Sequence, residues 1–481
     1  MQKTKQKHPG AFYTIFMLEI WERFAYIALV GILAVYLTSD LHMSTAEAFV
    51  LYGAFAALVY AFIVLGGYLG DKVLGAKRTI LLGLFVLLIG YVLMAVNRID
   101  TVYYAMSFIC VGTGLFKSNP SSLLAKCYPQ NGSERLHNAF TLFYMAINIG
   151  SMLGLFIIPG IAERYGYSAA FSGAVIAILL SIMTFIGFGF SLKSVSTEAG
   201  ERALNLKALI ITIMAVIFLI WLVQKLLNHI ILAKLVVVLT FVVCVILYIY
   251  LMFLIKKEGF FSKMLLALIL MVEAVVYKIA YIQMQTSINF YTINNATHRL
   301  FGFNIVPETF QSLNSVWIVI MSPVLAYYYV KSKNTRYSLN IYGKFTLGML
   351  LVSFAFLILY VSKFFAGPNG IVSGYWLVLS YFFQSTGELL ISALGLAMVA
   401  ELVPLRFTGF VIGLWWVFLA FASLLGGYVA SLTSPGNHHV SNKLILLNNY
   451  TDVFLLIGIG VFGFSCLMFL LSPLKRNLLT R

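Results

Sequence analysis

The chain has 481 residues, of which 61% are hydrophobic and only 10% are charged, and its mean hydropathy is +0.96. Because soluble globular domains carry about 25% charged residues, this composition excludes a soluble enzyme or binding domain and indicates an integral membrane protein. The formal net charge of +16 does not indicate a nucleic-acid partner. The basic residues lie in short loops between apolar runs, where such residues set the orientation of membrane helices.

Apolar runs of about 20 residues, the length at which a helix crosses the hydrocarbon core, recur along the whole chain. The start of the chain is basic and then apolar, like a signal peptide. However, Glu19, Glu22 and Arg23 interrupt the apolar run and no small-residue cleavage site follows, so we expect a first membrane helix there. The sequence predicts an all-α membrane protein with fourteen spans, near residues 12–38, 48–70, 79–97, 101–125, 138–162, 168–191, 206–224, 232–255, 264–291, 309–330, 343–362, 372–401, 408–432 and 451–473.

The fourteen spans divide into six, two and six. This division predicts a six-helix bundle over 1–195, a two-helix insertion over 196–260 and a second six-helix bundle over 261–481. The central pair carries almost no polar residues within its spans, so we expect it to lie at the periphery. Two six-helix halves are typical of the major facilitator superfamily, in which two repeats move around a site at the bilayer midplane.

The segment GGYLGDKVLGAKR, residues 66–78, resembles the loop between helices 2 and 3 of that superfamily. Its glycines permit close helix contact, Asp71 can cap the next helix, and Lys77 and Arg78 are expected to face the anionic leaflet. An ordinary basic turn is the alternative interpretation.

Lysine and arginine residues are distributed unevenly between the loops. With both termini placed in the cytoplasm, the cytoplasmic segments hold 22 of the 32 basic residues and the outer loops hold 7, while Arg23, Lys117 and Lys278 lie inside spans. Because basic loops remain on the cytoplasmic side of a membrane, this bias predicts an even number of spans and two cytoplasmic termini.

The first span carries a stripe of polar side chains. Residues three and four apart share one face of a helix, which brings together Glu19, Glu22, Arg23 and Tyr26. A charged side chain at the centre of a membrane helix costs roughly 2.5–3.5 kcal/mol on insertion scales, and one arginine cannot neutralise two glutamates. The surplus carboxylate is therefore either paired with a distant cation or protonated, which is the chemistry that proton coupling requires. A static salt bridge that only holds helices together is the alternative.

Ionisable side chains also lie in three other spans. Lys117 lies in GTGLFKSNPSSLL, Glu273 and Lys278 in LMVEAVVYKIAYIQMQTS, and Glu388 in YFFQSTGELLISALGLAM. Lys117 can supply the positive charge that the first span lacks, and Glu388 offers an anion to an ammonium group, so the two halves present opposite poles to a zwitterion. Any proton coupling is expected to use carboxylates, because no span interior contains one of the seven histidines, His8, His42, His137, His229, His298, His438 and His439.

Four motifs on separate spans resemble the proton-dependent oligopeptide transporter (POT/PTR2) family. They are ExxERFAY from Glu19 to Tyr26, GLFKSNPSSLL around Lys117, FYMAINIGSM from Phe143 to Met152, and GELLISALGLAMV from Glu388 to Val399. The similarity runs along nearly the whole chain and is greatest to the enterobacterial di- and tripeptide permeases, which also carry two extra helices between their halves.

The resemblance implies roles for individual residues. It implies proton coupling by Glu19, Glu22, Arg23 and Lys117, with the lysine also binding the carboxylate of the peptide. Asn314 and Glu388 are implied to lie near the amino terminus of the peptide, and Trp415 or its neighbour Trp416 to line a side-chain pocket. The full substrate-binding set that the resemblance implies is Arg23, Tyr26, Tyr60, Lys117, Tyr144, Asn148, Asn314, Glu388 and Trp415; for each aromatic member, packing alone is the alternative.

The sequence departs from the family pattern at three positions. Ile27 replaces a second tyrosine and Val30 replaces an arginine, which leaves more of the carboxylate recognition to Arg23 and Lys117. Gln283 stands where many members have an acidic residue, as it does in the enterobacterial permeases. Lys278 has two open interpretations: it pairs with Glu388 in the interior, or its long side chain extends to the membrane boundary.

The resemblance implies a proton-coupled symporter that imports di- and tripeptides across the bacterial inner membrane by alternating access, as a monomer without cofactor or metal. The four cysteines are scattered and form neither a disulfide framework nor a metal motif. Three alternatives remain: an intramembrane enzyme acting on small peptides, a transporter of another zwitterionic or anionic solute, and a channel. The spans contain no HExxH, Gly-x-Ser-x-Gly or paired-aspartate motif that would favour an enzyme.

Overall fold

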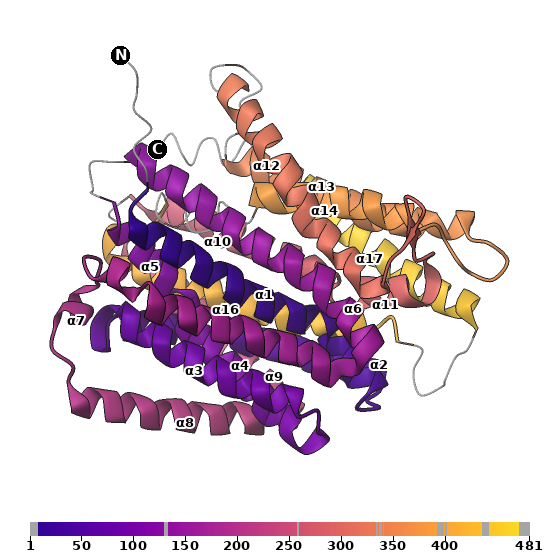
Figure 1. Cartoon of the computed structure of the whole chain (residues 1–481). Coiled ribbons are helices and arrows are strands. Elements are labelled where there is room, and N and C mark those ends of the chain that lie inside the picture. The colour runs from indigo at the N-terminus through magenta and orange to yellow at the C-terminus, as the bar shows by residue number, and fades with distance from the viewer. Residues whose placement is uncertain are drawn as a thin grey trace, which may run out of the picture. The chain divides into compact units, whose positions relative to one another are not determined.

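The computed structural model describes residues 8–128, 133–256, 259–332, 335, 339, 341–391, 399, 402–434 and 442–470. Long helices make up most of this part of the chain (Figure 1). Twelve helices among the described residues are long and apolar enough to cross a membrane. The only paired strands described are two short ones, β1 (Arg299–Leu300) and β2 (Phe303–Asn304), which form an antiparallel hairpin.

The first part of the chain forms helices in the order that the apolar runs predict. These elements are α1 (Gly10–Ser39), α2 (Thr45–Tyr68), η1 (Leu69–Val73), α3 (Ala76–Ala95), α4 (Ile99–Lys117), α5 (Asn119–Lys126), α6 (Ser133–Gly187), η2 (Gly189–Leu192), α7 (Glu198–Glu201), α8 (Leu206–Asn228) and α9 (Ile230–Leu254).

The second part of the chain continues the helical pattern on both sides of the strand hairpin. Its elements are α10 (Phe261–Ile282), α11 (Ser287–Asn295), η4 (Pro307–Gln311), α12 (Ser312–Ser332), α13 (Ile341–Val361), η5 (Ser362–Phe365), α14 (Tyr375–Ile391), η7 (Leu405–Phe407), α16 (Thr408–Ser431) and α17 (Lys443–Leu470).

Each of the fourteen predicted spans coincides with helix in the described residues. The long α6 contains two of them, which meet at Gly166, where the backbone leaves helical geometry with φ of 82°. The predicted span 372–401 corresponds to α14 as far as Ile391, and most of its remainder lies outside the described residues. The predicted start of the last span is wrong, because α17 already begins at Lys443 rather than near 451.

Two predicted spans are each divided into two helices. Span 101–125 becomes α4 and α5, which separate at Ser118, and span 264–291 becomes α10 and α11, which separate at residues 283–286. Pro120 near the start of α5 lacks the backbone N–H that a continuous helix would need. Helix breaks at membrane depth occur where they are buried in protein or line a cavity, so both breaks mark candidate functional regions.

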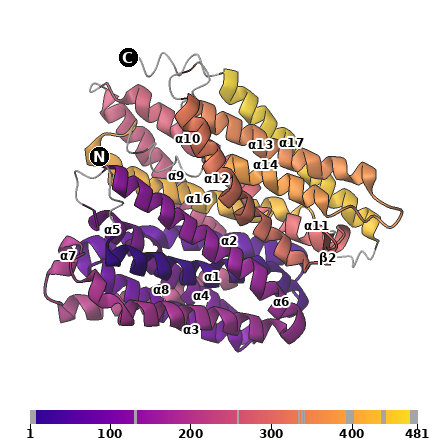
Figure 2. The same ribbon diagram turned by 45° about the horizontal axis from the view of Figure 1, so that its top comes forward.

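The chain forms two compact units, residues 1–31 with 58–229 and residues 32–57 with 230–481. In unit 1, α3 packs against α4 and α6, and α8 packs against α4. In unit 2, α13 lies beside α14 and α17, and α16 packs against α10 and α9 (Figure 2). The two central spans thus divide between the units, and most of their side chains are exposed, as their uniformly apolar sequences predict.

Candidate functional site

The polar stripe on α1 forms a buried ion pair in unit 1. The Arg23 guanidinium donates from Nε to Glu22 Oε2 and from Nη2 to Glu22 Oε1, each at 2.6 Å. Two parallel hydrogen bonds of this kind form a strong and geometrically specific arginine–carboxylate interaction. Both side chains are almost completely buried, so the pair replaces the water that each charge would otherwise require.

Glu19 is the second acid of this stripe. Its Oε1 lies 3.6 Å from Arg23 Nε, and the residue is 2% exposed. Its other oxygen, Oε2, makes no hydrogen bond to any described residue. Two buried carboxylates thus share one guanidinium, as the sequence predicts, and the hydrogen bonds favour Glu22.

Two aromatic rings extend this cluster. The Arg23 guanidinium lies 4.9 Å from the centre of the Tyr26 ring, and the Lys117 ammonium lies 5.5 Å from the centre of the Tyr60 ring. Lys117 also lies within electrostatic range of Glu22 and Glu19. A cation over an aromatic face is stabilised by the ring quadrupole, so the two tyrosines hold the two cations without neutralising them.

The break between α4 and α5 places Lys117 in this cluster. Lys117 is the last residue of α4, where the helix dipole favours a cation. Asn119 follows the break and donates from Nδ2 to the carbonyl of Leu115 at 2.7 Å and to the carbonyl of Gly66 at 3.1 Å. These bonds join the end of α4, which carries Lys117, to α2.

The predicted close helix contact at the glycine-rich segment 66–78 is confirmed, because a Cβ atom at Gly66 would lie 2.0 Å from the carbonyl oxygen of Gly114. The predicted cap is wrong. Asp71 lies within η1 and accepts a hydrogen bond from Ser122 at 3.3 Å, while the N-cap of α3 is Gly75, which makes no side-chain cap.

The two basic residues of the same segment contact backbone carbonyl groups of unit 1. Lys77 Nζ donates to Leu192, and the Arg78 guanidinium donates to Leu74 and Arg202. Their nitrogens therefore hold the segment against the chain that follows α6.

The predicted α6 residues lie on the part of the helix that approaches α1. Asn148 is buried and donates from Nδ2 to the carbonyl of Tyr144 at 2.9 Å, while Tyr144 is half-buried. Two residues after Asn148, a Cβ atom at Gly150 would lie 2.4 Å from the carbonyl oxygen of Ile20 and 3.0 Å from Arg23 Cβ. Only glycine therefore lets α6 approach the turn of α1 that carries the ion pair.

This contact predicts that Gly150→Ala destabilises the protein and disturbs Arg23. Its added methyl group meets backbone atoms, which cannot rotate away, and overpacking of this kind costs about 1–3 kcal/mol. The matched control is Gly160→Ala on the same helix, where nothing lies within 4 Å of the added atom. Thermal unfolding in detergent should show a lower midpoint for Gly150→Ala alone, and equal midpoints would contradict the packing role.

Unit 2 contains a separate acidic site. Asn314 on α12 donates from Nδ2 to Glu388 Oε2 at 2.8 Å and to Ser385 Oγ at 3.1 Å, both on α14. Glu388 is 8% exposed. Lys278 is 7% exposed and lies within electrostatic range of Glu388, and its Nζ lies 4.1 Å from the centre of the Tyr281 ring. These observations support the interpretation that places Lys278 in the interior.

Gln283 marks the break between α10 and α11 and is fully buried. Its Nε2 donates to the carbonyls of Ile279 at 2.9 Å and Gly426 at 3.1 Å, and its Oε1 accepts from Ser287 at 2.6 Å. An ionised acid could not donate to these two carbonyls, so the amide joins α10 to α16 in a way that glutamate could not reproduce.

The motif-based predictions overlooked two residues in these clusters. Ser385 shares a helix face with Glu388 because the two are three residues apart, so the spacing in STGE could have indicated it. Tyr91 on α3 lies within electrostatic range of Glu22 and Arg23. No local pattern marks it, because it is a single tyrosine in an apolar helix. Trp415 is buried in α16, and its half-buried neighbour Trp416 is more exposed.

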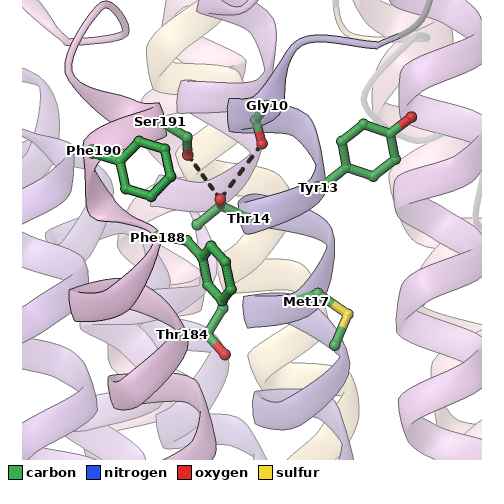
Figure 3. Close-up of a pocket in the computed structure, with 8 residues that line it drawn as sticks. All are labelled: Gly10, Tyr13, Thr14, Met17, Thr184, Phe188, Phe190 and Ser191. Atoms are coloured by element: carbon green, nitrogen blue, oxygen red, sulfur yellow. Dashed lines mark hydrogen bonds between the residues drawn. The ribbon is translucent and has the colours of Figure 1, made fainter.

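A cavity of about 320 Å³ lies elsewhere in unit 1, between the first turns of α1 and the end of α6 with η2 (Figure 3). Its lining includes Tyr13, Met17, Phe188 and Phe190, and the hydroxyls of Thr14 and Ser191 meet within it at 2.8 Å. It is lined by no charged residue and by none of the predicted site residues. This apolar cavity is therefore distinct from the ionisable cluster.

The described residues contain no group of three or more histidines, cysteines and acids that could hold a metal ion.

Comparison with known proteins gives matches along nearly the whole chain. A family model described as POT family matches residues 77–447. Dipeptide and tripeptide permease A of Escherichia coli (strain K12) is 44% identical over 477 residues, which cover 97% of this chain and 93% of that protein. The segment matched by the family model begins at residue 77 and so does not include α1.

Solved structures are similar along the whole chain. A structure of tetrameric PepTSo2 is 31% identical, with a TM-score of 0.87, and covers 98% of this chain and 99% of its own. A second, from work on substrate recognition in proton dependent oligopeptide transporters, is 30% identical, with a TM-score of 0.85, and covers 97% and 99%. The predicted major facilitator fold is confirmed, and this chain belongs to the POT family of transporters.

Proposed function

We propose that this protein is a proton-coupled symporter that imports di- and tripeptides across the bacterial inner membrane by alternating access. Its family relatives are permeases rather than enzymes, and the full-length similarity to a dipeptide and tripeptide permease supports peptide as the cargo. The observation that carries the coupling is the buried pair of acids, Glu19 and Glu22, which share the single guanidinium of Arg23.

In this mechanism Arg23 and Lys117 recognise the carboxylate of the peptide. A carboxylate that attracts Arg23 competes with Glu22 for the same N–H groups, because the bidentate bond occupies Nε and Nη2. A buried glutamate that loses its cation is strongly destabilised as an anion, so it takes a proton. Peptide and proton thereby become linked through one guanidinium.

Glu388 supplies the matching recognition of the peptide amine in unit 2. Asn314 orients its carboxylate through the 2.8 Å hydrogen bond, and the remaining carboxylate oxygen is suited to an ammonium group. Because every di- and tripeptide shares an amine, a carboxylate and amide bonds, recognition of these groups accepts many side chains. Tyr26, Tyr60, Tyr144, Asn148 and Trp415 are proposed to contact the rest of the peptide.

The remaining predictions concern topology and assembly. The bias of basic residues toward one set of loops supports two cytoplasmic termini. The bundles 1–195 and 261–481 and the insertion 196–260 are proposed as the repeat organisation. We propose a monomer as the transporting unit, although the similar PepTSo2 structure is described as tetrameric.

Uptake of labelled dialanine into proteoliposomes tests the function. Vesicles that are more acidic outside than inside should accumulate the intact dipeptide, and a protonophore should abolish the accumulation. At zero membrane potential, a difference of one pH unit supports up to about tenfold accumulation for each coupled proton. Vesicles that concentrate no short peptide under this gradient would contradict the proposal.

Glu388→Gln should weaken recognition of peptides with a free amine. A hydrogen bond to a charged group contributes about 1.5–3 kcal/mol, so we expect KM for dialanine to rise roughly tenfold or more. N-acetyl-dialanine lacks the ammonium group and should be transported equally poorly by both proteins. Ser385→Ala is the matched control because it removes only the longer contact of Asn314, at 3.1 Å. Equal KM values for wild type and Glu388→Gln would contradict this role.

A further inference from the structure

Tyr91 lies in the last turns of α3 and is completely buried. Its hydroxyl makes no hydrogen bond to any described residue. A buried hydroxyl without a partner is destabilising, and buried polar groups in native proteins are nearly always paired. Such a group calls for an explanation, for example a partner that it meets in another arrangement of its surroundings.

The surroundings of Tyr91 provide that explanation. Its hydroxyl interacts electrostatically with three charged or titratable groups of α1, namely Glu22, Arg23 and Tyr26. The helix that packs most extensively against α3 is α4, and it carries Lys117 and Cys110. Lys117 interacts electrostatically with Glu22, and Cys110 with Tyr26. The hydroxyl thus belongs to the same electrostatic cluster as the ion pair but does not bond to it in this arrangement.

A tyrosine hydroxyl can donate one hydrogen bond. While Arg23 holds both oxygens of Glu22, the carboxylate needs no further donor. When Arg23 turns to the carboxylate of a peptide, Glu22 loses both bonds at once. The buried hydroxyl of Tyr91, which interacts electrostatically with Glu22, then becomes an available donor. A hydrogen bond to an ionised carboxylate is stronger than one between neutral groups.

We propose that Tyr91 is a positioning residue for proton release, which donates a hydrogen bond to Glu22 when a peptide draws Arg23 away. The inference rests on the proposed symport. By stabilising the ionised carboxylate in the loaded protein, Tyr91 lets Glu22 give up its proton after the peptide has bound. Without this donor the loaded protein holds its proton more tightly.

The sign of the pH effect follows from this role. Tyr91→Phe removes a donor to the charged form of Glu22 and therefore favours the protonated form. The pH at which uptake falls to half its maximum should move to higher values, by about one unit for a tenfold change in proton affinity. Proton-independent exchange of peptide across the membrane should change less than about twofold, because the variant leaves Arg23 and Lys117 in place.

The experiment measures both activities in the same proteoliposomes for wild type and two variants. The matched control is Tyr381→Phe, since Tyr381 on α14 is also buried with a hydroxyl that lacks a hydrogen bond among the described residues. Exchange of labelled for unlabelled dialanine verifies that each variant is folded. Uptake from external pH 5 to 8 gives the midpoint.

An alkaline shift in Tyr91→Phe but not in Tyr381→Phe, with exchange retained, supports the inference. An unchanged midpoint, an acidic shift, an equal shift in both variants, or loss of exchange in Tyr91→Phe overturns it. Absence of uptake by the wild-type protein would instead contradict the proposed function itself, so the two failures are distinguishable.

Discussion

Glu22→Gln is expected to abolish proton-driven accumulation of peptide while exchange of peptide across the membrane continues. Glutamine has nearly the same shape as glutamate but cannot take or release a proton. In vesicles with an acidic exterior of one pH unit, the wild type can concentrate dialanine up to about tenfold per coupled proton, whereas the variant should only equalise its concentration. The measurement is the ratio of labelled dialanine inside and outside at steady state.

The structure predicts that this variant still folds. Removing one partner of a buried ion pair usually costs about 3–5 kcal/mol, because the other charge is left uncompensated. Here Glu19 Oε1 already lies 3.6 Å from Arg23 Nε and can compensate the guanidinium. In the double variant Glu19→Gln with Glu22→Gln no carboxylate of this stripe is left to compensate Arg23. This double variant should therefore unfold at a clearly lower temperature than Glu22→Gln alone.

Glu163→Gln is the matched control for Glu22→Gln, since this acid lies on α6 and is exposed. It should accumulate peptide like the wild type. If Glu22→Gln still accumulated dialanine above its external concentration in vesicles with an acidic exterior, Glu22 would not be the proton-coupling residue. Glu19 would then be the next candidate.

Lys117→Ala should impair transport through a second route, the loss of carboxylate recognition. Removing one partner of a buried, hydrogen-bonded charge pair typically costs 2 kcal/mol or more, so we expect KM for dialanine to rise roughly thirtyfold or more. Coupled uptake should fall further, because Lys117 lies within electrostatic range of both Glu19 and Glu22. Lys117→Arg keeps the charge and should recover part of the affinity.

The control for this prediction is Lys126→Ala at the exposed end of α5. It removes an equal charge outside the cluster and should leave KM unchanged. A peptide amide lacks the terminal carboxylate and therefore distinguishes loss of carboxylate recognition from misfolding of the variant. The wild type should transport this amide weakly, and Lys117→Ala should change that weak transport little. Equal loss for dialanine and its amide would indicate a structural role for Lys117.

The sequence by itself determined the features that depend on local spacing. Fourteen apolar runs predicted fourteen membrane helices, because helix length and apolarity are properties of consecutive residues. The stripe of Glu19, Glu22, Arg23 and Tyr26 followed from the helical repeat. Four motifs on separate spans also indicated the family, which the comparisons confirm.

Only the tertiary structure decided how these residues interact. Helical spacing favours Glu19 as the partner of Arg23, yet the long arginine side chain turns to its neighbour Glu22. Three features depend on helices that are distant in the chain: the interior placement of Lys278, the joining of α10 to α16 by Gln283, and the electrostatic interaction of Tyr91 with Glu22. The physical reason is that spacing along one helix determines which of its residues share a face, whereas packing between helices determines what that face meets.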